Sequence, residues 1–325
     1  MKKVAILAGG NSGEYEVSLK TAQNILNILD KNLFIPYFIH LKGLEWTYTD
    51  SGGKIYAIDK NDFSLTINNQ KIEFDVVFIA IHGTPGEDGK LQGYLDMLDI
   101  PYTGCDLFSS ALTFNKYFCN LTVAHFGVPV SPSLHFYKND ILDYEQIISV
   151  CELPCFVKPC NSGSSVGVTK VHNEKEFQEA IKEAFRHDHQ IMIEKFIPGR
   201  EVTCGMTRIN GSIQKLAITE IISKNEFYDF ESKYTDQLHD MKTPAEIGEE
   251  CSNAIFNYSE IIYHRLGCKG VVRMDYIVTP EGKPIFLEIN TIPGQTSMSI
   301  IPHQIQFLGM DIKDLYTNLI LEALS

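Results

Sequence analysis

The stretch 271–295 reads VVRMDYIVTPEGKPIFLEINTIPGQ and predicts a β-hairpin. Its two strand-like runs, 271–278 and 284–289, contain many β-branched and aromatic residues. The sequence Thr-Pro-Glu-Gly between them favours a turn. The stretch therefore predicts two neighbouring antiparallel strands.

The charged and amide side chains of this hairpin indicate a candidate metal site. Side chains alternate along a strand, so Arg273 and Asp275 share one face of the first run, and Glu288 and Asn290 share a face of the second. If the two faces coincide, three oxygen ligands converge beside an arginine. Such a set suits a hard cation like Mg²⁺, which substrate phosphates usually complete. A surface hairpin with solvated charges is the alternative.

The composition limits the class of protein. A chain of 325 residues is long enough for two or three domains. The net charge of -13 argues against nucleic acid as a partner, because nucleic acid is bound by clustered Lys and Arg. No apolar run approaches the roughly 18 residues of a membrane helix, and the first residues lack a cleavage-like segment, so we expect no membrane contact and a cytoplasmic location. The eight cysteines form no CxxC pair and favour reduced thiols over a zinc site.

The N-terminal part repeats a strand–loop–helix pattern, which predicts a buried parallel sheet. Strand 4–7 runs into a glycine loop and a helix, and strand 75–81 runs into a second glycine-rich loop and a helix. Glu14 and His82 follow these strands, where open α/β sheets bind ligands. A carboxylate at a helix N-terminus and a histidine bonded to loop backbone are the structural alternatives.

The middle of the chain holds a candidate phosphate-binding loop. The stretch 156–168 reads FVKPCNSGSSVGV, and its small residues would let backbone N–H groups approach phosphate oxygens while Lys158 offsets their charge. The Walker sequence is absent, and an ordinary turn is the alternative. Lys116 lies in an expected helix at 109–126, where a solvated lysine is also possible.

Two further segments follow. Strands at 191–197 and 201–207 flank a Pro-Gly linker that could hold an adenine by backbone bonds while Glu201 meets ribose hydroxyls. The polar and aromatic segment 223–243 has no clean period, and it is expected to be either a lid that docks or a disordered loop. Thr243, followed by proline and an acidic residue, predicts the start of a helix that runs to 266.

Taken together, these motifs resemble those of the ATP-grasp ligases, and among them the D-alanine:D-alanine ligases. The resemblance covers nearly the whole chain, because the family's motifs occur in the family's order: GGNSGEYEVS, HGTPGEDGKLQGYLDMLDIPYTG, TFNKYF, FVKPCNSGSSVGV, IEKFIPGREVT, YDFESKY, RMDY and FLEINTIPGQTSMSIIP. It implies an α/β fold of three domains: an N-terminal parallel-sheet domain, residues 1–105, followed by two ATP-grasp subdomains with antiparallel sheets, residues 106–198 and 199–325. ATP is expected between the two antiparallel sheets.

The resemblance also implies roles for individual residues. The positions that match phosphate contacts are Lys116, Lys158, Ser164, Ser165 and Lys233. The positions that match adenine and ribose contacts are Glu194, Lys195, Ile197 and Glu201. The positions that match ligands of two Mg²⁺ (or Mn²⁺) ions are Asp275, Glu288 and Asn290.

Substrate positions follow from the same match. Glu14 matches the carboxylate that meets the ammonium of the first D-alanine, and His82 lies near that substrate. Ser164 and Tyr234 match a hydrogen-bonded link from the lid to Glu14. The remaining matches are the oxyanion site at Arg273 and the Gly294 N–H, and the holders of the second substrate's carboxylate, Ser299 and Ile300.

The implied reaction joins two D-alanines through an acyl phosphate for peptidoglycan synthesis, and the implied assembly is a homodimer. Thr84, Pro85, Gln295 and Ile300 depart from the commonest family pattern, at peripheral positions or where backbone atoms act. Ligases that make D-alanyl-D-lactate generally lack the lid tyrosine, so Tyr234 favours the dipeptide product. Two alternatives stay open: a ligase that takes D-lactate or D-serine as its second substrate, and a nucleotide-binding regulator without turnover.

Overall fold

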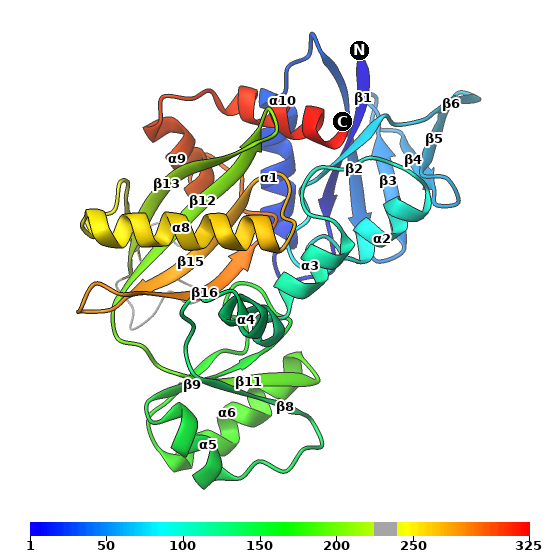
Figure 1. Ribbon diagram of the computed structural model, residues 1–325. Coiled ribbons are helices and arrows are strands. Elements are labelled where there is room, and N and C mark those ends of the chain that lie inside the picture. The colour runs from blue at the N-terminus through cyan, green and yellow to red at the C-terminus, as the bar shows by residue number, and fades with distance from the viewer. Residues whose placement is uncertain (224–238) are drawn as a thin grey trace.

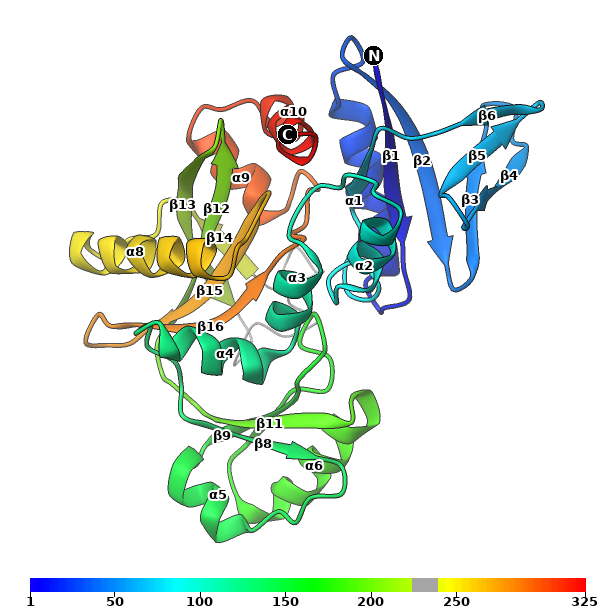
Figure 2. The same ribbon diagram turned by 45° about the vertical axis from the view of Figure 1, so that its right-hand side comes forward.

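The structure is a computed structural model that describes residues 1–223 and 239–325. Its backbone forms three β-sheets, which follow one another along the chain. In Figure 1 the first sheet lies at the upper right, the second at the bottom and the third at the upper left. Figure 2, which shows the molecule rotated about the vertical axis, has the same arrangement, so the three sheets and their helices lie around a common centre.

The first sheet has seven strands in the order β6-β5-β4-β3-β2-β1-β7. At its centre β1 (Lys2–Gly9) pairs in parallel with β2 (Phe34–Lys42) and β7 (Val76–Ile79), as the two strand–loop–helix repeats predicted. The helices of these repeats are α1 (Tyr15–Ile28) and α2 (Lys90–Met97). The predicted parallel sheet is therefore confirmed at the centre of a mixed sheet.

Four short strands extend this sheet in antiparallel fashion beyond β2: β3 (Glu45–Thr49), β4 (Ile55–Asp59), β5 (Ser64–Ile67) and β6 (Gln70–Ile72). Among these four, the sequence pattern indicates a strand only at 54–58, where β4 lies. The others are short and partly exposed, and their polar residues hide the alternation on which strand prediction depends.

The second sheet has four antiparallel strands in the order β10-β9-β11-β8. Its strands are β8 (Ser133–Tyr137), β9 (Cys155–Pro159), β10 (Thr169–Val171) and β11 (Gln190–Lys195). Two helices, α5 (Tyr144–Cys151) and α6 (Glu174–His187), complete its core with these strands. Asn173 caps α6 by accepting a hydrogen bond from the Lys175 N–H, and its side-chain amide donates to Glu176 at 2.6 Å.

The third sheet has five antiparallel strands in the order β14-β13-β12-β15-β16. Its strands are β12 (Arg200–Ile209), β13 (Ser212–Ser223), β14 (His239–Lys242), β15 (Val272–Val278) and β16 (Pro284–Asn290). The helix α8 (Glu249–Arg265) covers one face, where Tyr263, Tyr276 and Phe286 are fully buried. The predicted hairpin 271–295 is the pair β15–β16.

The last two helices join the first sheet to the third. They are α9 (Ile300–Phe307) and α10 (Ile312–Ala323). Ile301, Leu315 and Tyr316 from these helices share one apolar core with Val4 and Phe78 of the first sheet. The N-terminal and C-terminal parts therefore pack against each other, which brings the loops after β1 and β7 close to the end of β16.

The helix predicted at 109–126 is in fact two helices, α3 (Leu107–Phe114) and α4 (Lys116–His125). The break is at Asn115, whose backbone is extended and whose side chain accepts a hydrogen bond from the Phe118 N–H. An N-cap of this kind begins a new helix. Lys116 is therefore the first residue of α4, and both helices pack near β16.

The helix predicted from Thr243 begins later, at Glu249, so that prediction was wrong. The Thr243 hydroxyl lies 2.7 Å from the Thr219 hydroxyl, and the Ala245 N–H donates to the Ile218 carbonyl. Residues 243–245 therefore lie alongside β13 instead of starting a helix. Of the predicted lid segment 223–243, residues 239–242 form β14, while residues 224–238 lie outside the described residues.

Candidate active site

The register of the β15–β16 hairpin brings its polar residues together. Arg273 lies opposite Asn290, and Asp275 lies opposite Glu288, so the two predicted faces coincide. The Arg273 guanidinium donates to both carboxylate oxygens of Asp275, at 2.9 and 2.8 Å. Asp275 is buried, and a bidentate pair of this kind offsets the cost of burying its charge.

Lys116 connects this hairpin to the glycine- and serine-rich loop between β9 and β10. Its ammonium lies 3.0 Å from a carboxylate oxygen of Glu288 and donates to the Ser162 carbonyl at 2.6 Å. Burial opposes its charge, but the Glu288 carboxylate outweighs burial, and the pKa of Lys116 is raised above its ordinary value. The lysine is therefore a cation held between the loop and the hairpin.

Another lysine, Lys158, is buried on β9 of the second sheet. The Lys158 ammonium donates to Glu194 at 2.6 Å, and both residues are buried. The Asn120 amide of α4 contacts the other carboxylate oxygen of Glu194 at 3.4 Å. A single buried charge would be costly, and the two opposite charges of Lys158 and Glu194 compensate each other. A bound phosphate could replace Glu194 as the partner of Lys158.

The loop 160–168 contains left-handed backbone conformations of the kind found in anion-binding loops. Ser164 and Ser165 adopt left-handed φ angles of 50° and 58°, which are costly for residues other than glycine. The Asp188 carboxylate fixes the start of the loop by accepting the Asn161 N–H and the Asn161 amide, each at 2.8 Å. Strained, anchored backbone of this kind clusters at ligand-binding sites.

The tip of the loop contacts the N-terminal domain at Glu14. The Ser164 hydroxyl donates to a Glu14 carboxylate oxygen at 2.5 Å. A Cβ added at Gly163 would lie 2.5 Å from the other Glu14 oxygen, so a side chain there would displace the Glu14 carboxylate. The loop and Glu14, which are 150 residues apart in the sequence, therefore meet directly.

His82 is buried beside the same carboxylate. Its Nδ1 donates to the Ile292 carbonyl at 2.8 Å, and its Nε2 lies 3.0 Å from the Thr21 hydroxyl. Burial lowers the pKa of His82, which keeps the ring neutral. Both ring nitrogens are thus hydrogen-bonded within the protein, one of them to loop backbone, as expected if His82 has a structural role.

Glu87 is a buried residue of the site that the sequence interpretation missed. One of its oxygens accepts the Gly83 N–H at 2.9 Å, and the other has no hydrogen-bond partner among the described residues. Burial, followed by the nearby Glu14 charge, raises the pKa of Glu87 to about 8. Its position five residues after His82, in the loop that follows a buried strand, was the available sequence signal.

Beyond β16, Gly294 and Ser299 lie side by side. A Cβ at Gly294 would be 2.8 Å from the Ser299 hydroxyl oxygen. That oxygen accepts the Thr296 N–H at 3.1 Å, and Ser299 is the N-cap residue of α9. Ile300, which follows, is buried.

The proposed adenine and ribose contacts lie where β11 leads into β12, between the second and third sheets. The Lys195 ammonium pairs with Glu152 at 2.5 Å. Ile197 is half-buried in the linker, and Glu201 is half-buried in β12, opposite Ile277 of β15. Lys233 and Tyr234 lie outside the described residues.

The oxygen donors of the hairpin fit Mg²⁺ in kind. Within residues 1–223 and 239–325, no group of three or more His, Cys, Asp or Glu side chains is arranged to hold a metal. The set on the hairpin is instead two carboxylates and one amide, Asp275, Glu288 and Asn290. Mg²⁺ uses few protein carboxylates and takes its other ligands from water and phosphate.

Two antiparallel sheets with buried lysines and carboxylates between them, joined to a parallel-sheet domain, are the architecture of an ATP-grasp ligase. The family models "D-ala D-ala ligase N-terminus" and "D-ala D-ala ligase C-terminus" match residues 3–105 and 122–321. The chain belongs to the D-alanine–D-alanine ligase family, and the enzyme class predicted from the sequence is confirmed.

Individual proteins agree with this assignment. The chain is 44% identical to the D-alanine–D-alanine ligase of Parabacteroides distasonis, over 99% of this chain and 98% of that one. It is 41% identical to the D-alanine–D-alanine ligase of Flavobacterium johnsoniae, over 98% of each chain.

Solved structures are also similar along their whole length. D-alanyl-alanine synthetase A from Vibrio cholerae has a TM-score of 0.90 at 28% identity, covering 99% of this chain and 98% of that one. The VanG D-Ala:D-Ser ligase from Enterococcus faecalis has a TM-score of 0.86 at 33% identity, covering 99% of each. The D-alanine–D-alanine ligase from Bacillus anthracis complexed with ATP has a TM-score of 0.80 at 26% identity, covering 100% of this chain and 98% of that one.

Proposed function

We propose that this chain ligates two D-alanines to D-alanyl-D-alanine with ATP, releasing ADP and phosphate, as a step in making peptidoglycan precursors. The observation that carries the proposal is the position of Lys116, which contacts both Glu288 of the hairpin and the Ser162 carbonyl of the loop. One largely covered cation thus joins the proposed phosphate loop to the proposed metal-binding strands, as transfer of a phosphoryl group requires.

In the first step, the carboxylate oxygen of one D-alanine attacks the γ-phosphate, the bond to ADP breaks, and D-alanyl phosphate forms. Glu14 holds the ammonium group of this D-alanine and so orients its carboxylate. Lys116, Lys158 and the N–H groups at Ser164 and Ser165 surround the transferring group with positive charge. Lys158 is buried and the Lys116 side chain is 13% exposed, which supports this role, because charges act more strongly away from water.

Asp275, Glu288 and Asn290 would hold two Mg²⁺ or Mn²⁺ ions, which would supply charge neutralisation to the phosphates. Glu194, Lys195, Ile197 and Glu201 would line the adenine and ribose side, and Lys233 would add a further phosphate contact. The position of the β11–β12 linker between two sheets supports the nucleotide assignment.

In the second step, the amine of another D-alanine attacks the activated carbonyl, and phosphate leaves with its bonding electrons. Arg273 and the Gly294 N–H stabilise the oxyanion, an effect of about 3 to 4 kcal/mol per donor in comparable enzymes. Ser299 and Ile300 hold the carboxylate of this second substrate. The proximity of Gly294 to Ser299 supports placing both groups on one substrate.

The domain limits remain part of the proposal: 1–105, 106–198 and 199–325, with residues 223–243 as a lid in which Tyr234 approaches Ser164 and Glu14. His82 lies near the first substrate and is hydrogen-bonded to the Ile292 carbonyl and the Thr21 hydroxyl. The three sheets fall within the three ranges, which supports the division.

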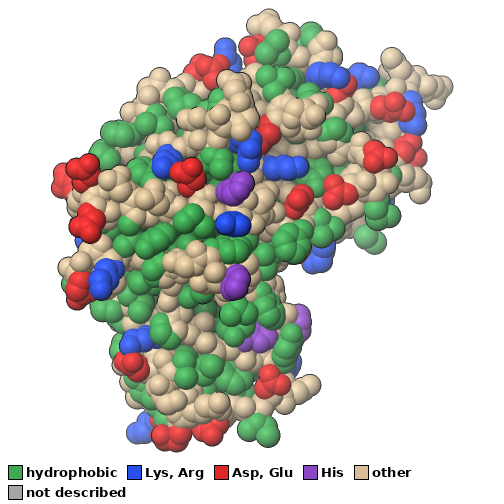
Figure 3. All heavy atoms as spheres, in the orientation of Figure 1, with side chains coloured by type: hydrophobic (Ala, Val, Ile, Leu, Met, Phe, Trp, Pro, Cys, Tyr) green, Lys and Arg blue, Asp and Glu red, His purple; other side chains and the backbone are tan. Residues whose placement is uncertain are grey.

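We also propose a cytoplasmic homodimer that binds neither nucleic acid nor membrane. The eight cysteines are free and buried, which suits a reducing compartment. Figure 3 shows acidic and basic side chains interspersed over the face that it draws. Over the described parts of the chain, none of the helices combines the length and apolar character needed to cross a bilayer.

Product analysis tests the reaction. Protein, ATP and Mg²⁺ are mixed with D-alanine alone, with L-alanine, or with D-alanine plus D-serine or D-lactate, and the products are identified by mass spectrometry. We expect D-alanyl-D-alanine as the main product in every mixture that contains D-alanine. The similarity to a D-Ala:D-Ser ligase makes the D-serine mixture informative. Phosphate release that does not depend on D-alanine would contradict the proposal.

A further inference from the structure

The turn at 292–295, directly after β16, carries the Gly294 N–H, and its position depends on contacts with the N-terminal domain. Within the turn, the Gln295 side-chain amide donates to the Pro293 carbonyl at 3.2 Å. The Ile292 N–H donates to Asn290 at 2.9 Å. These local bonds shape the turn, but they do not fix where it lies relative to the first substrate's site.

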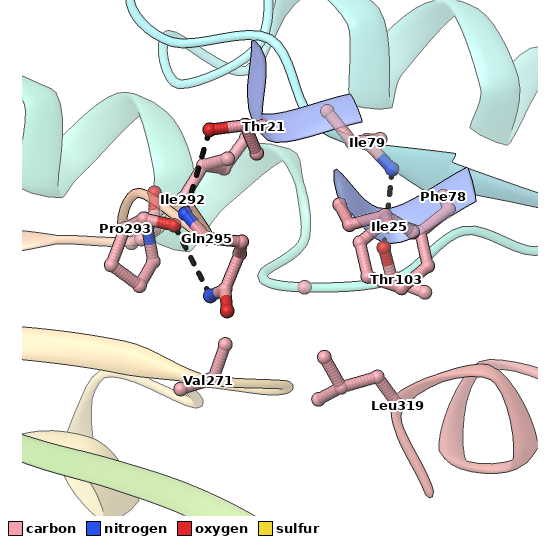
Figure 4. Close-up of a pocket in the computed structure, with 12 residues that line it drawn as sticks. Thr21, Ile25, Phe78, Ile79, Thr103, Val271, Ile292, Pro293, Gln295 and Leu319 are labelled. Atoms are coloured by element: carbon pink, nitrogen blue, oxygen red, sulfur yellow. Dashed lines mark hydrogen bonds between the residues drawn. The ribbon is translucent and has the colours of Figure 1, made fainter. Parts of the chain in front are cut away.

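Helix α1 holds both backbone polar groups of Gln295. The Gln295 N–H donates to the Thr21 hydroxyl oxygen at 3.4 Å, and the Asn24 amide donates to the Gln295 carbonyl at 2.6 Å. Thr21 and Asn24 are three residues apart, so they lie on one face of the helix. Figure 4 shows Thr21 directed at the Gln295 backbone across the junction between the two domains.

These contacts form a chain of hydrogen bonds with one defined direction. The Ile292 carbonyl can only accept, so His82 Nδ1 carries the proton. In the neutral ring Nε2 then accepts, and the Thr21 hydroxyl donates to it. The Thr21 oxygen is left to accept the Gln295 N–H. Thr21 and His82 are 1% and 3% exposed, so water cannot easily replace either partner.

The same helix begins one residue after Glu14, the proposed first-substrate carboxylate. A cavity of about 30 Å³ lies beside the contacts and is lined by Thr21, Thr103 and Gln295 among others. The cavity interrupts the packing on this side of the turn, so the hydrogen bonds to α1 contribute to holding it in place.

We infer that Thr21 and Asn24 are positioning residues that set the 292–295 turn, and with it the Gly294 N–H, relative to the first D-alanine. This inference rests on the proposed function. Helix α1 would then set the distance between the two halves of the reaction, with Glu14 at its start and the oxyanion turn held about two to three helical turns further along.

Matched variants test the inference. Thr21→Val keeps the shape of the side chain and removes the hydroxyl, while Thr21→Ser keeps the hydroxyl. We expect Thr21→Val to lower kcat about three- to tenfold with an unchanged KM for ATP, and Thr21→Ser to restore most of the rate. Asn24→Ala should act like Thr21→Val. Gln23→Ala, on the exposed side of the same helix, should match the wild type.

Amide hydrogen exchange supplies a readout that does not depend on the substrates. The peptide covering 292–298 should exchange faster in Thr21→Val and Asn24→Ala than in the wild type and Gln23→Ala. Unchanged exchange and kcat in Thr21→Val, or a loss in Thr21→Ser as large as that in Thr21→Val, would overturn the inference. If the wild type makes no dipeptide, the proposed function fails, and the exchange result still decides whether α1 holds the turn.

Discussion

Glu14 occupies the point where the N-terminal domain and the central loop meet. Its carboxylate accepts the Ser164 hydroxyl and lies close to Gly163, where a side chain would displace it. One residue thus serves two purposes, because it would bind the first substrate and also hold the phosphate loop against the N-terminal domain.

Glu14→Gln should therefore weaken the first D-alanine more than ATP. Replacing a charged acceptor of an ammonium group costs about 1.5 to 3 kcal/mol, so we expect KM for the first D-alanine to rise about 10- to 100-fold. Steady-state kinetics with each substrate varied in turn would measure this. Glu16→Gln, an exposed residue in the first turn of the same helix, is the control. Equal losses for D-alanine and ATP would contradict the assigned role.

Glu87 gives the stability of the fold a dependence on pH. Its pKa is raised from 4.5 to about 8, with burial as the main cause, so the native state holds a proton that the unfolded chain releases at lower pH. Between these two values the native state binds more protons, and the free energy of unfolding falls as pH rises.

Glu87→Gln removes this dependence while keeping an oxygen that can accept the Gly83 N–H. We expect the variant to match the wild type near about pH 5 and to be more stable above about pH 8, by on the order of a few kcal/mol at most. Denaturant unfolding at several pH values measures the difference. The exposed Glu45→Gln should follow the wild-type curve, and a parallel curve for Glu87→Gln would show that Glu87 is ionised when buried.

At the scale of elements, the β15–β16 hairpin combines charges that would otherwise be too costly to bury. Its carboxylates are paired with cations, Asp275 with Arg273 and Glu288 with Lys116. A ligand that brings metal and phosphate together can take over these partners, because it supplies both signs of charge.

Asp275→Asn should raise the Mg²⁺ concentration needed for half-maximal activity, because an amide oxygen carries no net charge for the cation. We expect an increase of about tenfold or more, which corresponds to about 1.4 kcal/mol. A Mg²⁺ titration at saturating ATP and D-alanine measures it. Glu281→Gln, in the turn of the same hairpin, should leave the Mg²⁺ requirement unchanged. The metal assignment fails if both variants keep the wild-type requirement.

At the scale of the whole molecule, the domains share cores instead of folding as separate bodies. Helix α9 packs on β13 of the third sheet, and α10 contacts both β12 of that sheet and β7 of the first. Cys105 and Cys119 lie in the core of the third sheet. All eight cysteines are free and buried. Burial raises the pKa of Cys119, Cys151, Cys160 and Cys204 to about 12, so their thiols stay protonated.

The native protein should therefore be nearly inert to a thiol reagent such as Ellman's reagent, because the thiolate is the reactive form and the sulfurs are covered. On denaturation all eight thiols should react. Absorbance under the two conditions counts them. Rapid reaction of one or more thiols in the native protein would contradict this expectation, and if the reacting thiol is Cys105 or Cys119 it would show that the domains separate far enough to open a shared core.

Local patterns in the sequence were sufficient for the elements that depend on near neighbours. Alternation along residues 271–278 and 284–289 predicted the hairpin and its shared polar face. In the same way, Asn173 followed by Glu176 has the spacing of a capping box, and α6 begins there. The order of the motifs predicted the family, the fold class and the ligation reaction, which the comparisons confirm.

What the sequence could not supply depends on contacts between distant residues. Thr243 has the pattern of a helix cap but bonds to Thr219 of β13, and α8 begins later. Glu87 gained its raised pKa only from burial beside Glu14. The bond from Gln295 to Thr21 spans 274 residues. The sequence by itself determined the hairpin with its Arg273, Asp275, Glu288 and Asn290, because period and turn chemistry are local. Only the tertiary structure decided which charges pair and which helix holds the turn beyond that hairpin, because packing sets those distances.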